Sequence, residues 1–164
     1  MRETSMQPHG LDAFDRRILE ILQRDNRTPQ RRIGEMVNLS APAVQRRIKR
    51  LEEEGVIAAN VAILAPEKLG RSLSIIVEIS VESERSDDLD AVKAAFRAAP
   101  EVQQCYYVTG DVDFVLVVLV ADMAEYEALT RRLFFGNANV KKFRTLVTMD
   151  RVKAGAAIKI DAPG

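Results

Sequence analysis

The sequence is poor in residues that build disulfides and metal sites. Its 164 residues include one cysteine, Cys105, and one histidine, His9. A lone cysteine cannot form an internal disulfide, which is typical of a reducing cytoplasm. Cys105 is a candidate redox sensor, but no basic neighbour in the sequence lowers the pKa of its thiol, so a buried structural cysteine is expected instead. With the only histidine near the N-terminus, we expect no metal site and no other cofactor.

Long apolar runs are also missing. The longest stretch, residues 114–121, is far shorter than the roughly 20 residues of a membrane helix and suits a buried strand. Residues 1–10 lack the apolar core of a secretion signal and are expected to form a disordered tail. The sequence therefore predicts a cytoplasmic protein without a membrane partner.

The chain has no net charge overall, but positive charge is concentrated in one segment. The 24 basic and 24 acidic residues cancel, within an ordinary globular composition of 47% hydrophobic and 29% charged residues. Residues 27–50, however, contain seven basic residues and a single acidic one, Glu35. A local basic surface on a neutral chain indicates a polyanion partner.

The N-terminal part has the apolar period of three short helices. Asp12, Thr28 (which is followed by proline) and Ser40 predict the caps that begin them, and Gly55 predicts the end of the third. The second and third helices, joined by a tight turn, have the helix-turn-helix arrangement. Residues 56–64 are expected to follow as an extended strand.

The C-terminal part alternates strands and helices. Ser86 is expected to cap its first helix, and residues 156–160 to add a short strand. The predicted order is β-α-β-β-α-β, the ferredoxin-like pattern, with strands at 72–81, 102–109, 113–120 and 140–149 and helices at 86–99 and 123–135. The fold class is therefore α+β. The predicted domains are a helix-turn-helix domain at 11–64, a linker at 65–71 and a sensing domain at 72–164.

The predicted third helix presents polar side chains away from its apolar face. An α-helix fits the major groove, where glutamine pairs with adenine and arginine with guanine, and cations at the start of the second helix can meet phosphates. The alternative is a solvated face of i, i+4 ion pairs. The candidate DNA contacts are Arg31, Arg32, Ser40, Ala41, Ala43, Gln45, Arg46, Arg47, Lys49 and Arg50.

The predicted turn around Gly110 is a second candidate site. Its free backbone amides suit a carboxylate, and Asp111 or Asp113 can accept from the amino group of a bound amino acid. The alternative is an ordinary hairpin turn. Tyr106 and Tyr107 must point to opposite faces of their strand, one expected in the core and the other toward an interface or ligand.

The run from residue 11 to 57, with Asp15, Ser40, Arg47 and Gly55 in register, resembles the Lrp/AsnC family of transcription regulators. Similar stretches follow at Leu69-Gly70, in the loop VTGDVD and in the closing strand from Thr145. The resemblance implies a winged or bare helix-turn-helix joined to a ligand-sensing RAM domain. It implies homodimers through that domain, often assembled into octamers, and it leaves Arg47 open between a structural and a base-reading role.

The resemblance further implies a small-molecule effector, usually an amino acid, bound between subunits. The family loop commonly has an aromatic residue where this chain has valine. The candidate effector-binding residues are Tyr107, Gly110, Asp111, Val112, Asp113 and Thr145.

Two rival functions differ in class. An enzyme similar to the sirohaem decarboxylases needs general acids, but the sensing domain has no histidine, and the chain has no Gly-rich phosphate loop or Gly-x-Ser-x-Gly motif. A broad-specificity DNA-bending or packing protein without effector response stays open. The sequence predicts a non-enzymatic, sequence-specific DNA-binding regulator whose assembly and DNA affinity respond to a small molecule.

Overall fold

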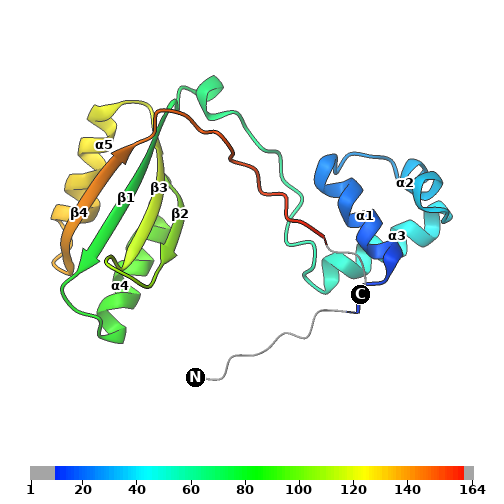
Figure 1. Cartoon of the computed structure of the whole chain (residues 1–164), viewed down its shortest axis with the longest axis horizontal. Helices are drawn as coiled ribbons and strands as arrows, with labels where there is room; N and C mark the ends of the chain where they lie inside the picture. Colours follow the sequence, from blue (N-terminus) through cyan, green and yellow to red (C-terminus); the bar gives the residue numbers. More distant parts are fainter. Residues whose placement is uncertain (1–9, 161–164) are drawn as a thin grey trace. The chain divides into compact units, whose positions relative to one another are not determined.

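The computed structural model describes residues 10–160, which divide into two compact units (Figure 1). One unit runs to Ile63 and also includes the segment that begins at Gly155, and the other is Leu64–Ala154. The predicted sensing domain continues to residue 164, whereas the structure groups residues 155–160 with the helical unit. The tail predicted at 1–10 lies, except for Gly10, outside the described residues.

The first unit consists of three helices, as predicted. They are α1 (Ala13–Arg24), α2 (Gln30–Val37) and α3 (Ala41–Glu53). Each is apolar on one face only, and these faces meet in a small core. The fully buried side chains of this core are Ile18, Ile33, Val37 and Val44.

Two of the three predicted helix caps are confirmed. Asp12 forms a reciprocal capping box with Asp15, and the Ser40 hydroxyl accepts from the Ala43 N–H at 3.4 Å. The prediction for Thr28 is wrong, because α2 begins at Gln30 with Pro29 at its cap position and no side-chain cap bond. The Thr28 hydroxyl instead donates to the Asp25 carbonyl at 2.8 Å, which closes the preceding turn.

The turn between α2 and α3 depends on a glycine inside α2. A Cβ at Gly34 would lie 2.4 Å from the carbonyl oxygen of Leu39, so a larger residue cannot occupy this position without moving the turn. Asn38 supports the same turn from the left-handed region, with φ 58°, which asparagine tolerates better than most residues. Together they set the approach of α3 to α2.

Two predicted strands are absent. Residues 56–64 contain no strand, because no neighbouring strand in the first unit offers a hydrogen-bonding partner, and Val61 and Ile63 are exposed. Residues 156–160 contain none either. The Gln23 side-chain amide occupies both backbone groups of Ile158, donating to its carbonyl at 3.1 Å and accepting from its N–H at 2.8 Å.

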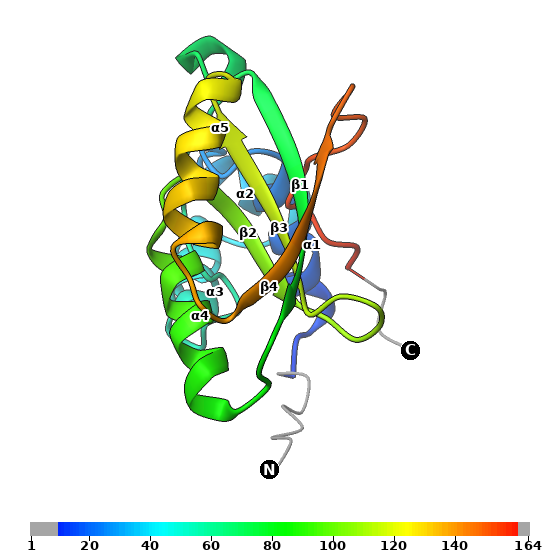
Figure 2. The ribbon, with the colours of Figure 1, turned by 90° about the vertical axis from the view of Figure 1, so that its left-hand side faces the viewer.

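The second unit confirms the ferredoxin-like prediction. A short 3-10 turn, η1 (Pro66–Leu69), precedes a four-stranded antiparallel sheet of order β2-β3-β1-β4, whose helices lie on one face (Figure 2). The elements are β1 (Leu73–Val81), α4 (Ser86–Ala98), β2 (Val102–Tyr107), β3 (Phe114–Val120), α5 (Met123–Thr130), the π-turn η2 (Arg131–Phe135) and β4 (Val140–Val147).

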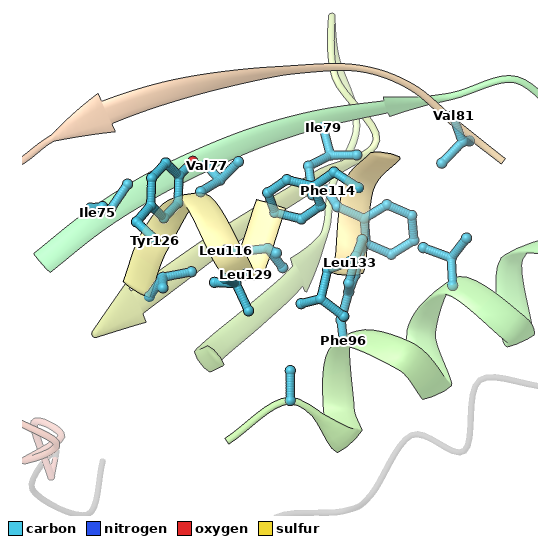
Figure 3. Packing of buried hydrophobic residues seen from close by; sticks show 14 of the residues in the cluster. Ile75, Val77, Ile79, Val81, Phe96, Phe114, Leu116, Tyr126, Leu129 and Leu133 are labelled. Carbon is cyan, nitrogen blue, oxygen red and sulfur yellow. The ribbon is translucent and has the colours of Figure 1, made fainter. Parts of the chain in front are cut away.

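The core of this unit lies between the sheet and its two helices (Figure 3). Alternate residues of β3 point into it, so Phe114 and Leu116 are buried while their neighbours are half-buried. Phe96 of α4 packs edge-on against Phe114, with ring centroids 5.6 Å apart. The long apolar run near residue 114 is thus a central strand, as predicted.

The start of α4 corrects another predicted cap. Ser86 is the first helical residue, preceded by Arg85 without a side-chain cap bond. The local polar contacts come from Ser83, whose hydroxyl donates to the Asp88 carboxylate at 2.6 Å and accepts from the Arg85 N–H. The turn before the helix, rather than its first residue, supplies the bonds.

Candidate DNA-binding surface and effector loop

The outward face of α3 presents three polar side chains to solvent. Gln45, Arg46 and Lys49 are all exposed, and their spacing places them on the side of the helix opposite Val44 and its core neighbours. Lys49 lies 3.6 Å from Glu53, but both side chains are well exposed, so this pair stabilises little. These three groups are available to a partner that lies along the helix.

The other two cations of α3 are bound within the unit. Arg47 donates to Asp15 at 2.8 Å and to Asp12 at 2.7 Å, and Arg50 donates to Asp15 at 2.6 Å. The hydrogen bonds to Asp15 raise the pKa of both guanidinium groups above their usual value. The structure therefore gives Arg47 a structural contact, and it pairs Arg50 with α1.

The carboxylate that binds both arginines was not among the candidate functional residues predicted from the sequence. Asp15 is fully buried and also accepts from the Asp12 N–H at 3.2 Å. The signal was present, because Asp15 stands three residues before Ile18 and so on the buried face of α1. A carboxylate on an apolar face requires a cationic partner.

The remaining candidate DNA contacts lie at the start of α2 and at the start of α3. Arg31 and Arg32 are exposed in the first turn of α2, each 3.5 Å from the exposed Glu35. Ser40 caps α3, and its backbone leads into the first helical turn with Ala41 and Ala43, which are half-buried. All ten predicted positions thus lie on α2, α3 and the turn between them.

The loop from Val108 to Asp113 is anchored at its end rather than open. The Asp113 carboxylate accepts from the Val81 N–H at 2.8 Å, and its own N–H donates to the Ile79 carbonyl at 2.9 Å. Asp111 is exposed, and Gly110 adopts φ 125°, a conformation that strongly favours glycine. Asp113 therefore ties the loop to β1, while Gly110 and Asp111 face solvent.

The two strand residues predicted to join this loop lie at opposite edges of the sheet. Tyr107 is on β2, where its ring packs at 5.0 Å against Phe114 and below the Lys93 ammonium. Thr145 is on β4, where its hydroxyl shares a 2.6 Å hydrogen bond with the Tyr126 hydroxyl. The six candidate effector residues do not converge within one chain.

Edge strand β2 overturns two expectations about burial. Tyr106 and Tyr107 are 52% and 50% exposed, so neither is a core residue. Cys105 is exposed as well, because an edge strand has a neighbour on one side only. Partial desolvation raises the pKa of the Cys105 thiol, and this outweighs the opposing effect of Arg97 and Lys93.

The sheet face opposite the helices carries an apolar band. Both helices of this unit cover the other face (Figure 2), so the band has no cover from its own unit. An apolar band of this kind marks an interaction surface. It consists of Ile76 on β1, Val115, Val117 and Leu119 on β3, and Leu146 on β4.

These features define the class of protein: a helix-turn-helix unit with an exposed polar face on α3, joined to an α+β unit with an uncovered sheet face. Within residues 10–160, no helix has the length and apolar character to cross a membrane, and no three potential metal-ligating side chains cluster. Two family models match, the Lrp/AsnC ligand binding domain over residues 74–158 and a winged helix-turn-helix DNA-binding domain over residues 11–58.

Individual relatives agree with both models. An uncharacterized HTH-type transcriptional regulator of Sinorhizobium fredii is 46% identical, covering 92% of this chain and 89% of its own length. The leucine-responsive regulatory protein of Haemophilus influenzae is 40% identical, covering 88% and 87%. The chain belongs to the Lrp/AsnC family of transcriptional regulators, not to an enzyme family.

Solved structures show the same fold. An AsnC family transcriptional regulator from Agrobacterium tumefaciens has a TM-score of 0.86 at 32% identity, covering 91% of this chain and 97% of its own. A Neisseria meningitidis transcriptional regulator in complex with L-Met has a TM-score of 0.85 at 26% identity, covering 91% and 96%. The described residues of this chain contain no wing strand after α3.

Proposed function

We propose that the protein is a sequence-specific DNA-binding regulator of the cytoplasm that reads the major groove with α3. The observation that carries the proposal is that the polar residues of α3 fall into two groups, one exposed to solvent and one bound within the unit. Gln45, Arg46 and Lys49 face solvent, whereas Arg47 and Arg50 are bound to Asp15. All three exposed side chains are base-reading types, because glutamine pairs with adenine and arginine or lysine with guanine.

The phosphate contacts come from the start of α2 and the turn that follows. Arg31 and Arg32 are exposed there, and their pairs with Glu35 are long and solvated, so a phosphate can replace the carboxylate at little cost. Ser40, Ala41 and Ala43 bring the backbone of the first turn of α3 close to the same strand, and a helix N-terminus attracts phosphate. Much of the affinity is then salt-dependent.

The functional form is a homodimer that assembles further into an octamer. Its support is the apolar band on the uncovered face of the sheet, which a second copy can bury. Dimers place two recognition helices in major-groove half-sites about one helical turn, or a multiple, apart. Isolated chains would leave this band exposed to water.

The effector is a small molecule, an amino acid, bound between subunits beside the loop of Gly110 and Asp111. Support comes from the ligand-binding family model and from the relative solved with L-Met. Tyr107 directly precedes the loop, but Thr145 lies on the opposite edge strand of the sheet, so a site made from all of them requires a second chain. The effector changes DNA affinity only as far as it binds one assembly more tightly than the other.

Fluorescence anisotropy tests the proposal with a duplex from upstream of the protein's own coding region and a scrambled duplex as control. Each is titrated at two salt concentrations, with and without each amino acid. Preference for the native duplex, altered by one amino acid, is expected. Preference without any amino-acid response would remove the effector, equal binding to both duplexes would indicate a packing protein, and no binding at low salt would overturn the proposal.

A further inference from the structure

Asp15 holds an unusual position for a carboxylate in a unit that binds a polyanion. It is fully buried, and its two oxygens accept from different arginines of the recognition helix. Arg47 donates to Oδ1 and Arg50 to Oδ2, at 2.8 Å and 2.6 Å. One side chain of α1 therefore binds α3 at two points that are three residues, or nearly one helical turn, apart.

These two bonds divide the four cations of α3 into two pairs. Arg46 and Lys49 are exposed, while Arg47 and Arg50 are half-buried with donors committed to Asp15. An arginine guanidinium binds carboxylates and phosphates alike. If the Asp15 charge were removed, Arg47 would keep its Asp12 partner, whereas the Arg50 donor would be free for a DNA phosphate.

Removing those cations from the DNA surface has a consequence for specificity. Phosphate contacts add affinity for every sequence equally, whereas base contacts discriminate. A carboxylate that occupies two arginines therefore lowers the affinity for all DNA without touching the base-reading face. The two-point attachment also fixes the rotation of α3 about its axis, and hence which side chains face the base edges.

We propose that Asp15 is a specificity-determining positioning residue: it keeps Arg50 and, together with Asp12, Arg47 away from DNA phosphates, and it holds α3 so that Gln45, Arg46 and Lys49 read bases. The inference rests on the proposed DNA-binding function. It differs from a purely structural role, in which losing Asp15 lowers the amount of folded protein and weakens binding to all DNA alike.

The test is Asp15→Asn in the full chain, which keeps the shape of the side chain and removes its charge. Affinities for the native and scrambled duplexes are measured across a salt series. Arg50 is released, whereas Arg47 keeps its bond to Asp12 at 2.7 Å. The salt dependence for scrambled DNA therefore steepens by about one counterion, which is about a threefold larger loss of affinity between about 50 and about 200 mM salt. The preference for the native duplex falls by about tenfold, the value of one base contact.

Asp12→Asn is the matched control. It makes the same change of charge in the same network, but Arg47 stays bound to Asp15, and asparagine is as good a helix cap as aspartate. A general gain of positive charge affects both variants, whereas release of Arg50 affects only Asp15→Asn. Equal salt slopes in the two variants would overturn the proposal.

A second variant keeps the test decisive if Asp15→Asn does not fold by circular dichroism. Arg50→Gln loosens the attachment without adding a free cation. It should lower the preference for the native duplex and leave the salt slope on scrambled DNA as it is. A slope reduced by about one counterion would show that Arg50 already contacts phosphate and would refute the inference. A wild-type chain without any sequence preference would instead refute the proposed function, and the inference with it.

Discussion

The hydrogen bond between Tyr126 and Thr145 separates two roles for Thr145, an effector contact or a structural partner of α5. The hydroxyl oxygens are 2.6 Å apart, and the Tyr126 side chain is 4% exposed. Thr145→Val keeps the shape of the strand residue and leaves the buried phenol without a partner. A buried donor left unsatisfied costs about 1–3 kcal/mol.

Removing the hydroxyl of Tyr126 instead should destabilise the protein less. Tyr126→Phe leaves the hydroxyl of Thr145, which is only half-buried, so water can replace the lost partner and the cost is about 0.5–1.5 kcal/mol. The double variant removes both hydroxyls and no unsatisfied group remains. Its destabilisation should therefore be smaller than the sum of the single ones, by about 1 kcal/mol of coupling.

Tyrosine fluorescence measures this effect in the intact chain. The sequence has three tyrosines and no tryptophan, and Tyr106, Tyr107 and Tyr126 all lie in the unit Leu64–Ala154, so the signal follows the unfolding of that unit. One kcal/mol shifts the midpoint of a domain of this size by about 4–8 °C. Thr109→Val, at an exposed loop position, is the control for the substitution itself.

Additive effects of the two single variants would refute the structural role. So would a Thr145→Val protein of unchanged stability that no longer responds to its effector, because Thr145 would then serve the ligand site. Strong coupling with the effector response retained would remove Thr145 from the candidate effector residues.

Four further outcomes follow from the same geometry. Arg46→Ala should weaken binding to the native duplex by about 1–3 kcal/mol, whereas Arg97→Ala, an exposed arginine of α4, should not; equal affinities by anisotropy would remove Arg46 from the interface. Gly34→Ala adds a Cβ 2.4 Å from a carbonyl oxygen of the turn, so overpacking should exceed the gain in helix propensity and destabilise the helical unit by a net of about 1–2 kcal/mol in urea unfolding followed by circular dichroism. Burial raises the pKa of Tyr126, against the opposing hydrogen bond of its hydroxyl partner, so the neutral phenol is favoured in the folded state. The stability from this group is complete below about pH 10 and lost as pH rises through the folded pKa, and Tyr126→Phe should flatten that loss in unfolding curves at alkaline pH. Asp111→Ala should abolish the amino-acid response measured by anisotropy and spare DNA binding without effector; a retained response would place the effector elsewhere.

Local patterns in the sequence determined most of the architecture. The starts of α1 and α3 follow from Asp12 and Ser40, since a cap acts on backbone groups three residues away. The apolar run near residue 114 predicted a central strand, and the alternation of strands and helices predicted the ferredoxin-like order. These signals lie within a few residues of the element they define, so a single chain displays them.

Only the tertiary structure decided which polar side chains are free to bind a partner and which are bound within the chain. Whether an arginine of α3 faces DNA or a carboxylate depends on Asp15, which lies 32 residues from Arg47 in the chain. The exposure of Tyr107 depends on β2 being an edge strand, and the failure of residues 56–64 and 156–160 to form strands depends on the partners that each backbone finds. A side chain's type fixes what it can bind, but contacts between distant segments decide what it does bind.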